Sequence, residues 1–313
     1  MEVNYIPSGY EKNKLRTHAF EDSDLDKVLN KVKKKINDKK SFNAKELLLI
    51  LEDLASFPLG QHIILNGGAN GAWTDYLISP QEYLENDLTN FDCSFLERFF
   101  LFHSPSVLAQ RELFRLAQNI AEKKFHDGGK RFASIPCGIM RDLLNSNFSF
   151  SKEVSLIGVD LDPLSLELAS QLALKLNISN VSFIEKDAWN LGYNYEFDFI
   201  NSIGLNVYES DRESVIELYN QLYRALKTDG ILFTGVLTWP PYIDKSKSEW
   251  VIDKIPKFDL HLEKIIHKDL LDLKWLNFRK LDEMELDFKR AGFSRVEICQ
   301  DSRCVFPAII AKK

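Results

Sequence analysis

Short apolar segments alternate with amphipathic segments from residue 130 to the C-terminus, and few folds accept such an alternation. The apolar segments have the length of buried strands, and the segments between them place apolar residues at helical spacing. The pattern predicts strands at residues 131–136, 154–160, 181–185, 197–202 and 230–237, and helices at residues 139–145, 163–176 and 211–226. Strands and helices in this order build a mainly parallel sheet that is covered on both faces.

The C-terminal end of this region departs from the parallel pattern. A final helix is predicted at residues 281–291, and two strands follow at residues 294–299 and 305–311. So short a connection suits an antiparallel pair, because parallel strands need a crossover of a dozen or more residues. Before the final helix, residues 238–280 form a long insertion that is rich in tryptophan, proline and charged residues.

The first part of the chain has helical periodicity instead. Helices are predicted at residues 24–40, 43–57, 93–102 and 106–125, and the lysines of the first are expected to form a solvated face. The sequence His-Asp-Gly-Gly at residues 126–129 marks the end of this part. We therefore predict two domains, a helical N-terminal cap or substrate domain at residues 1–127 and an α/β domain at residues 128–313.

Residues 60–80 are rich in glycine and contain an Asn-Gly pair. We predict a shaped loop here, because loops with such residues often carry function.

Charge and cysteine content exclude several classes of protein. The chain has 40 basic and 46 acidic residues, a formal net charge of −6, which disfavours an enzyme that binds nucleic acid through a basic face. Four cysteines form no C-x-x-C pair and no cluster at metal-ligand spacing, so we expect a reducing compartment and no metal site. The N-terminus lacks a signal pattern, and no apolar run approaches the length of a bilayer span, which predicts a cytoplasmic protein without a membrane partner.

The turn after the first strand points to a nucleoside ligand. It runs from Ser134 to Asp142 and contains one glycine, Gly138, rather than a G-x-G-x-x-G fingerprint. Ile139 and Met140 stand where a dinucleotide site requires small residues, so NAD and FAD are disfavoured. A smaller nucleoside ligand needs one close backbone approach, which Gly138 provides.

Carboxylates follow the second and third strands at the expected positions for such a ligand. Asp160 lies 22 residues after Gly138 and could accept hydrogen bonds from both ribose hydroxyls. Asp162 precedes a proline and is interpreted as the start of a helix. Asp187 could accept from the exocyclic amine of adenine, and Trp189 could flank the ring. Each of these residues also has an ordinary structural interpretation, as a turn residue or a packing residue.

These segments resemble the class I S-adenosylmethionine-dependent methyltransferases, and the resemblance spans residues 130–313. SIPCGIMRD is similar to the first motif of the family, Asp160 to its ribose-binding acid, and KDAW to its adenine-binding segment. FDFINSIGLNVY is similar to its fourth strand and loop, and RALKTDGILFTGVL to the helix, turn and fifth strand that follow. The chain departs from the first motif, because Ser134 stands in place of the usual acid, and Pro136 and Met140 in place of later glycines.

The resemblance implies a Rossmann-like sheet of seven strands, mainly parallel, whose last two form an antiparallel hairpin. It also implies S-adenosylmethionine as the cofactor and S-adenosylhomocysteine as the product. The residues that it assigns to cofactor binding are Pro136, Cys137, Gly138, Arg141, Asp160, Leu161, Asp187, Ala188, Trp189, Ser202 and Gly204.

The first part of the chain resembles the helical N-terminal extension of a minority of these enzymes. The similarity consists of an N-G-x-W-T-x-Y motif at residues 70–76 and an R-E-x-F motif at residues 111–114. The substrate of that group is undefined, so this likeness does not identify the reaction.

Methyl transfer depends mainly on alignment in a dry pocket, so the sequence need not contain a general base, and we assign no catalytic residue. His62, His103 and His261 are candidate bases. The fourth strand ends in Asn-Ser-Ile-Gly and lacks the Asp/Asn-Pro-Pro-Tyr of many nitrogen methyltransferases. By exclusion, a small organic molecule methylated on oxygen is expected, in a pocket closed by the N-terminal helices and residues 238–280. Candidate residues for binding it are Trp73, Asp75, Tyr76, Arg111, Asn206, Tyr208, Trp239 and Tyr242.

Two alternatives have other consequences. A catalytically idle protein on the same fold would bind the nucleoside and use its helical domain to bind a partner. An NAD-dependent oxidoreductase is disfavoured by the missing glycines. The oligomeric state is not evident from the sequence.

Overall fold

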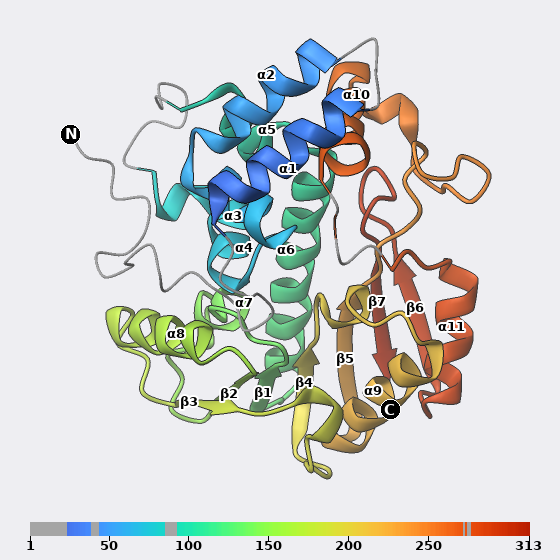
Figure 1. The fold of residues 1–313 in the computed structure, drawn as a ribbon. Helices are drawn as coiled ribbons and strands as arrows, with labels where there is room; N and C mark the ends of the chain where they lie inside the picture. The colour runs from blue at the N-terminus through green and yellow to red at the C-terminus, as the bar shows by residue number, and fades with distance from the viewer. Residues whose placement is uncertain (1–23, 39–43, 85–92, 272, 274–276) are drawn as a thin grey trace. The chain divides into compact units, whose positions relative to one another are not determined.

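The computed structural model describes residues 24–38, 44–84, 93–271, 273 and 277–313 (Figure 1). The chain divides into two compact units, one of residues 1–108 and 255–274 and the other of residues 109–254 and 275–313. The N-terminal segment, and the junction at residues 39–43 between the first two predicted helices, lie outside the described residues.

Seven strands among the described residues form one sheet in the larger unit, in the order β3-β2-β1-β4-β5-β7-β6. The five strands β1 to β5 pair in parallel, and β7 pairs antiparallel with both β5 and β6, which confirms the predicted sheet and hairpin. The strands are β1 (Arg131–Ser134), β2 (Ser155–Asp160), β3 (Val181–Glu185), β4 (Phe197–Asn201), β5 (Leu226–Gly235), β6 (Arg295–Cys299) and β7 (Ala308–Lys312). The helices α7 (Arg141–Leu144), α8 (Pro163–Lys175), α9 (Arg212–Ala225) and α11 (Leu281–Arg290) accompany them.

Strand β1 has β2 on one side and β4 on the other, so the strand order changes direction at β1. In the parallel register its last residue, Ser134, lies opposite Gly158 of β2 and Asn201 of β4. The carboxyl ends of these strands therefore meet at one edge of the sheet, where open α/β sheets bind their ligands.

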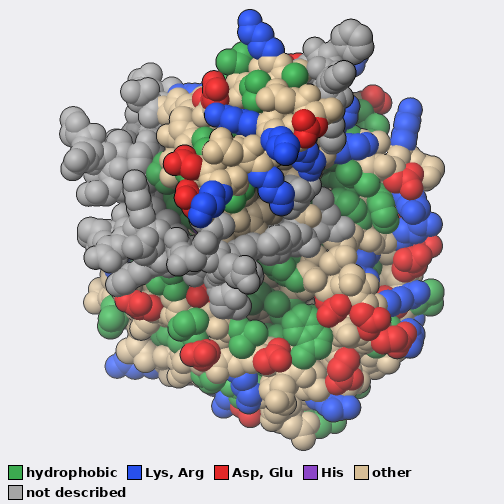
Figure 2. All heavy atoms as spheres, in the orientation of Figure 1, with side chains coloured by type: hydrophobic (Ala, Val, Ile, Leu, Met, Phe, Trp, Pro, Cys, Tyr) green, Lys and Arg blue, Asp and Glu red, His purple; other side chains and the backbone are tan. Residues whose placement is uncertain are grey.

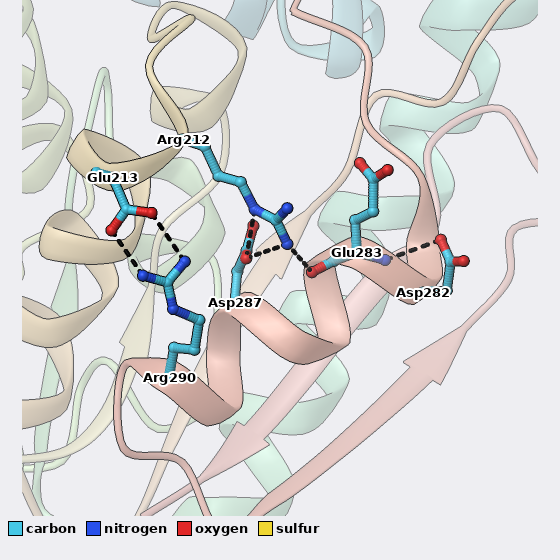
Figure 3. A network of polar contacts seen from close by, with 6 residues as sticks. All are labelled: Arg212, Glu213, Asp282, Glu283, Asp287 and Arg290. Atoms are coloured by element: carbon cyan, nitrogen blue, oxygen red, sulfur yellow. Dashed lines mark hydrogen bonds and ion pairs between the residues drawn. The ribbon is translucent and has the colours of Figure 1, made fainter.

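Two ion pairs fasten α11 to α9 (Figure 3). Arg212 Nε donates to Asp287 Oδ1 at 2.8 Å, and Asp287 is 1% exposed. Arg290 donates to both oxygens of Glu213, at 2.9 and 2.7 Å, but this second pair is exposed to solvent. The pair with the buried Asp287 thus holds a helix that packs on the core formed with β6 and β7.

The boundary between the two units lies in helix α6 (Pro105–His126). The division falls after residue 108, inside this helix, whereas the sequence placed the domain boundary after residue 127. Most of α6 packs with the larger unit, because Glu112 accepts hydrogen bonds from Ser302 and Arg303 and Leu113 lies against Gly235. A β-carbon added to Gly235 would lie 2.4 Å from Leu113 Cδ2.

The smaller unit is helical, as predicted. Its helices are α1 (Leu25–Asp38), α2 (Ala44–Ala55), α3 (Pro58–Asn66), α4 (Gly71–Ile78), α5 (Phe95–Phe102) and α10 (Lys257–Lys264), and a π-helix at Ile265–Leu270 continues α10. Thus part of the 238–280 insertion is helical, and Leu262, Ile265 and Ile266 join the core of the smaller unit. Lys27, Lys31 and Lys34 of α1 are exposed, whereas Lys33 and Lys35 are half-buried. Figure 2 shows basic and acidic side chains mixed on the visible face.

The prediction of a shaped loop at residues 60–80 is wrong, because most of this segment forms α3 and α4. Gly60 lies inside α3, and a β-carbon there would lie 1.8 Å from the carbonyl oxygen of Leu54. Gly67 has a φ of 67° and ends α3, and Asn70 caps α4 by accepting from the backbone of Trp73. The glycine and asparagine residues therefore allow close packing and capping instead of forming a long loop.

Among the described residues, no single helix is both long and apolar enough to span a bilayer, although α2 and α3 pass that test as a pair bent by 113°.

Candidate functional site

The loop after β1 is held against β2. The backbone N–H of Gly138 donates to Asp160 Oδ2 at 2.8 Å, and the N–H of Cys137 donates to the carbonyl of Val159 at 2.9 Å. Gly138 has a φ of 48° and Met140 a φ of 59°. The loop thus adopts the left-handed conformation at two positions, one of them occupied by methionine.

The sulfur atoms of Cys137 and Met140 pack inside this loop. Gly158 on β2 leaves the necessary room, since a β-carbon there would lie 3.0 Å from both Cys137 Sγ and Met140 Sδ. Burial and the nearby carboxylate of Asp160 raise the pKa of the Cys137 thiol well above its usual value. Cys137, which the sequence assigned to cofactor binding, is therefore a protonated thiol that packs inside the loop.

Asp160, the predicted ribose-binding acid, is held in place from two sides. Its Oδ2 accepts from Gly138, and its Oδ1 accepts from the backbone N–H of Asp162 at 3.0 Å. Burial raises its pKa above that of an exposed aspartate. Asp162 caps α8 by accepting from the N–H of Leu164 at 3.1 Å, which confirms its interpretation as the start of a helix.

The residues after β3 form a short turn. Asp187 Oδ1 accepts from the backbone N–H of Trp189 at 2.9 Å and begins the 3-10 helix Ala188–Asn190. The Trp189 indole N–H donates to the carbonyl of Ser214 at 2.9 Å, which ties this turn to α9. Leu161, after β2, is 48% exposed, an apolar side chain left uncovered beside the aspartates of the strand ends.

The loop after β4 contains two residues predicted to bind the methyl acceptor, Asn206 and Tyr208, and their surroundings differ. Asn206 is 3% exposed, and its Nδ2 donates to the Tyr219 hydroxyl at 2.9 Å and to the Gly235 carbonyl at 2.8 Å, so it joins the loop to β5 and α9. Tyr208 is half exposed, and burial of its hydroxyl and the charge of Asp160 raise its pKa. Tyr208 therefore lies within electrostatic reach of the predicted ribose site.

Sequence reasoning missed a buried polar cluster beneath the loop. The Asp142 carboxylate is 4% exposed and accepts from Ser134 Oγ at 2.9 Å and from Asn201 Nδ2 at 2.5 Å. Burial raises its pKa. Asn201 Oδ1 and Ser202 Oγ are buried and have no hydrogen-bond partner among the described residues. One signal in the sequence could have pointed to this cluster. β1 ends in Ser134 rather than in an acid, and an aspartate, Asp142, follows in the next helix.

The other predicted cofactor residues line the same strand ends. Pro136 follows Ile135 through a cis peptide bond, and Arg141 begins α7. Ala188 is buried in the turn after β3, and Gly204 has a φ of 105° after β4, with open space where a β-carbon would point.

Three residues predicted to bind the methyl acceptor are buried in the smaller unit. Trp73 is 2% exposed, Asp75 3% and Tyr76 1%. Tyr76 donates to Glu97 Oε1 at 3.0 Å, and the Tyr83 hydroxyl donates to Asp75. They form an aromatic and acidic cluster with these partners.

The remaining predicted residues belong to the larger unit, except for the three candidate bases His62, His103 and His261. Burial lowers the pKa of Arg111 to about 10, with a smaller contribution from Arg115. Trp239 packs at 5.2 Å from Phe278, and Tyr242 lies edge-on to Trp250 at 6.0 Å. The candidate bases His103 and His261 belong to the smaller unit, His103 at the end of α5 and His261 on α10.

The described part of the chain contains no group of three or more His, Cys, Asp or Glu side chains arranged to hold a metal ion.

Known proteins share this fold. Residues 135–230 match the family model described as a methyltransferase domain, and no curated protein matches the chain. Among solved structures, the chain is similar to a possible exported protein from Bordetella parapertussis, with 29% identity, a TM-score of 0.83, and coverage of 92% of this chain and 95% of that one. It shares the fold of a protein proposed to be an O-methyltransferase from Nostoc punctiforme, with 14% identity, a TM-score of 0.50, and coverage of 84% and 72%.

Proposed function

We propose that this chain, which carries a class I S-adenosylmethionine-dependent methyltransferase domain, transfers a methyl group from S-adenosylmethionine to oxygen of a small organic molecule. The observation that carries the proposal is the link between Gly138 and Asp160 at the point where the strand order changes direction. This link fixes a carboxylate and a close-approach glycine beside each other, as a nucleoside requires.

The strand ends fit the nucleoside part of the cofactor. Asp160 would accept from the ribose hydroxyls, and Asp187 would face the adenine amine beside the apolar side chain of Leu161. Asp187 accepts a hydrogen bond within its own turn through Oδ1, which leaves Oδ2 as the oxygen for the ligand. Adenine binding thus requires one rigid turn rather than a new loop conformation.

The methionine end of the cofactor meets the buried cluster of Asp142, Asn201 and Ser202. The hydrogen-bond donors that face the Asp142 carboxylate are neutral: two side chains and two backbone amides. The acceptor oxygen of Asn201 and the hydroxyl of Ser202 are left over. A primary ammonium group supplies the missing positive charge and donors. We therefore assign to Asp142 the carboxylate that the first motif lacks at Ser134.

When bound, the cofactor supplies a methyl group activated by a sulfonium sulfur. The chain's own residues orient the two reactants and exclude water, and this alignment is worth about 7–11 kcal/mol in favourable systems. No general base is assigned. We propose that the N-terminal helices and residues 238–280 close the pocket of the methyl acceptor. The support is the sequence argument, together with the presence of residues 255–274 in the helical unit.

The proposal includes a small-molecule partner, no nucleic acid and no membrane, and a cytoplasmic location remains part of it. The reaction is tested by incubating the chain with tritium-methyl S-adenosylmethionine and the low-molecular-weight fraction of a cell extract. Transfer of tritium to a molecule of that fraction is measured. Label that alkali releases as methanol, as from a methyl ester, or that hydriodic acid releases as methyl iodide, as from a methyl ether, supports methyl transfer to oxygen. Tight binding of S-adenosylhomocysteine without transfer would favour the alternative, a catalytically idle nucleoside-binding protein.

A further inference from the structure

The chain returns from its long insertion between the loop after β4 and the end of β5. The backbone N–H of Arg279 donates to the carbonyl of Leu237 at 3.0 Å, just after β5. The side-chain amide of Asn277 donates to the carbonyl of Val207 at 2.9 Å, in the loop after β4. All four residues belong to the larger unit. This return segment, residues 277–280, is therefore built into the edge of the sheet at which the parallel strands end.

The guanidinium group of Arg279 holds the same loop at two further points. Its Nη2 donates to the carbonyl of Glu209 and lies 3.5 Å from the carbonyl of Asn206. Tyr208 lies between these two residues in the chain. Together with Asn277, Arg279 thus binds backbone carbonyls on both sides of Tyr208, and each contact restricts the backbone that carries the tyrosine ring.

The loop is fixed from its other side as well. The Asn206 side chain donates to the Tyr219 hydroxyl and to the Gly235 carbonyl, which joins the loop to α9 and to the end of β5. The backbone N–H of Tyr208 donates to the carbonyl of Leu205 at 3.1 Å and closes a turn of 3-10 helix. Tyr208 therefore has a defined position at the end of a loop that is held from two sides.

Tyr208 leaves a large apolar surface uncovered at the predicted ribose site. The side chain is 51% exposed, whereas its hydroxyl is buried and lies within reach of the charge of Asp160. Strands β2 and β4, which lead to Asp160 and to this loop, are separated only by β1, so their ends lie about 10 Å apart. Leu161, next to Asp160 in the chain, is 48% exposed. Two large apolar side chains thus stand uncovered near a carboxylate, across a span that one nucleoside fills.

We propose that Arg279 is a positioning residue for cofactor binding, because it holds the loop after β4 so that the Tyr208 ring covers the ribose of the bound nucleoside. A half-exposed ring beside a ribose-binding carboxylate loses apolar area to the ligand when the nucleoside binds, which favours binding. A loop that is already fixed makes this contact without an ordering cost, whereas a loose loop has to be ordered on binding. The inference rests on the proposed function and adds the return segment to the cofactor site.

The test is a double-mutant cycle in which S-adenosylhomocysteine affinity is measured by calorimetric titration. Tyr208→Ala is expected to weaken binding about tenfold, the contribution of one aromatic contact. Arg279→Ala is expected to weaken it about fivefold, because the ring is retained but no longer held. The double variant is expected to bind no more weakly than Tyr208→Ala, because Arg279 acts through that ring. Two independent residues would instead give the product of the single effects, about fiftyfold.

A second ligand locates the contact. 5′-Methylthioadenosine carries the ribose and lacks the amino-acid end of the cofactor. Tyr208→Ala and Arg279→Ala are each expected to weaken 5′-methylthioadenosine by the same factor as S-adenosylhomocysteine.

A spectroscopic readout follows the ring directly. In protein with carbon-13-labelled tyrosine rings, the signal that Tyr208→Phe removes should shift when S-adenosylhomocysteine is added. In Arg279→Ala the same signal should already be displaced before any ligand is present.

Two further variants control for the fold. Asn277→Ala removes one contact of the return segment and keeps the arginine, and is expected to weaken binding about twofold. Arg295→Ala removes an exposed arginine of β6 in the same unit and is expected to bind as the unaltered chain does. Circular dichroism checks that each variant folds. If Arg279→Ala does not fold, Asn277→Ala takes its place in the cycle.

Unchanged affinity in Tyr208→Ala, or in the return-segment variant of the cycle, would overturn the inference. A double variant that shows the product of the single effects would also overturn it, because the arginine would then support the fold independently of the ring. Weakening of S-adenosylhomocysteine without weakening of 5′-methylthioadenosine would place Tyr208 at the other end of the cofactor and overturn it too. An unaltered chain that does not bind S-adenosylhomocysteine would instead contradict the proposed function itself.

Discussion

The backbone N–H of Gly138 donates to the carboxylate of Asp160 at 2.8 Å, and this hydrogen bond joins the loop after β1 to the end of β2. The same carboxylate accepts from the N–H of Asp162. A side chain that was predicted to hold the ribose therefore also shapes the loop that the nucleoside would approach.

Asp160→Ala should weaken S-adenosylhomocysteine binding by about a hundredfold, because hydrogen bonds to a charged group contribute about 1.5–3 kcal/mol each. The fold should persist, since Asp160 lies at a strand end. Calorimetric titration measures the affinity, and circular dichroism checks the fold. Lys33→Ala, on α1 of the helical unit, is the control and should bind normally. An affinity of Asp160→Ala within twofold of the unaltered chain would show that the ribose lies elsewhere.

Asp142→Asn should separate the two ends of the cofactor. The amide keeps the shape of the side chain but loses its negative charge, so S-adenosylhomocysteine should bind at least tenfold more weakly. 5′-Methylthioadenosine has no amino-acid end and should bind equally well to both proteins. Competitive titration of the two ligands gives the comparison. Equal weakening of both ligands would mean that Asp142 supports the loop and does not contact the ammonium group.

The ion pair between Arg212 and the buried carboxylate of Asp287 should stabilise the fold more than the exposed pair of Arg290 and Glu213. Arg212→Ala leaves the Asp287 carboxylate buried and unpaired, and should lower the free energy of unfolding by about 2 kcal/mol. Arg290→Ala breaks an exposed, solvent-screened pair and should lower the free energy of unfolding by clearly less than Arg212→Ala does. Urea unfolding of both variants makes the comparison, and equal costs would contradict the assignment of burial to Asp287.

His62 should make the stability of the chain depend on pH. Its folded pKa of about 4 lies below the unfolded value of 6.5, so the unfolded chain binds more protons between these values. This contribution is complete above pH 6.5 and is lost as the pH falls towards 4, by about 2 kcal/mol between pH 7 and pH 5. His62→Phe should therefore lose less stability over this interval in urea unfolding. Parallel pH profiles for the two proteins would contradict a buried neutral histidine.

The sheet was predictable from the sequence because its strands are short apolar runs separated by helices and turns. β3, predicted at residues 181–185, has the observed bounds, and the C-terminal hairpin follows from the short connection before β7. In the helical unit the same reasoning failed at residues 60–80. There glycine is required by the contact between Gly60 and Leu54, and such a contact between helices leaves no periodic signal in the sequence.

The site was predictable where one residue type follows a strand end, as with Gly138 and Asp160. The Asp142 cluster was not, because its members come from β1, α7 and β4, and only the sheet register brings Ser134 opposite Asn201. Similarly, the buried ring nitrogens of His62 and Trp73, which have no hydrogen-bond partner among the described residues, meet only through the packing of α3 and α4. A sequence shows residue types at intervals along the chain, whereas these groups are defined by three-dimensional contacts.

The most direct test of the account is calorimetric titration of the purified chain with S-adenosylhomocysteine, with NADH and ATP as controls. The account predicts saturable binding of S-adenosylhomocysteine at one site per chain and no binding of NADH or ATP. Absence of S-adenosylhomocysteine binding, or equal binding of NADH, would contradict it.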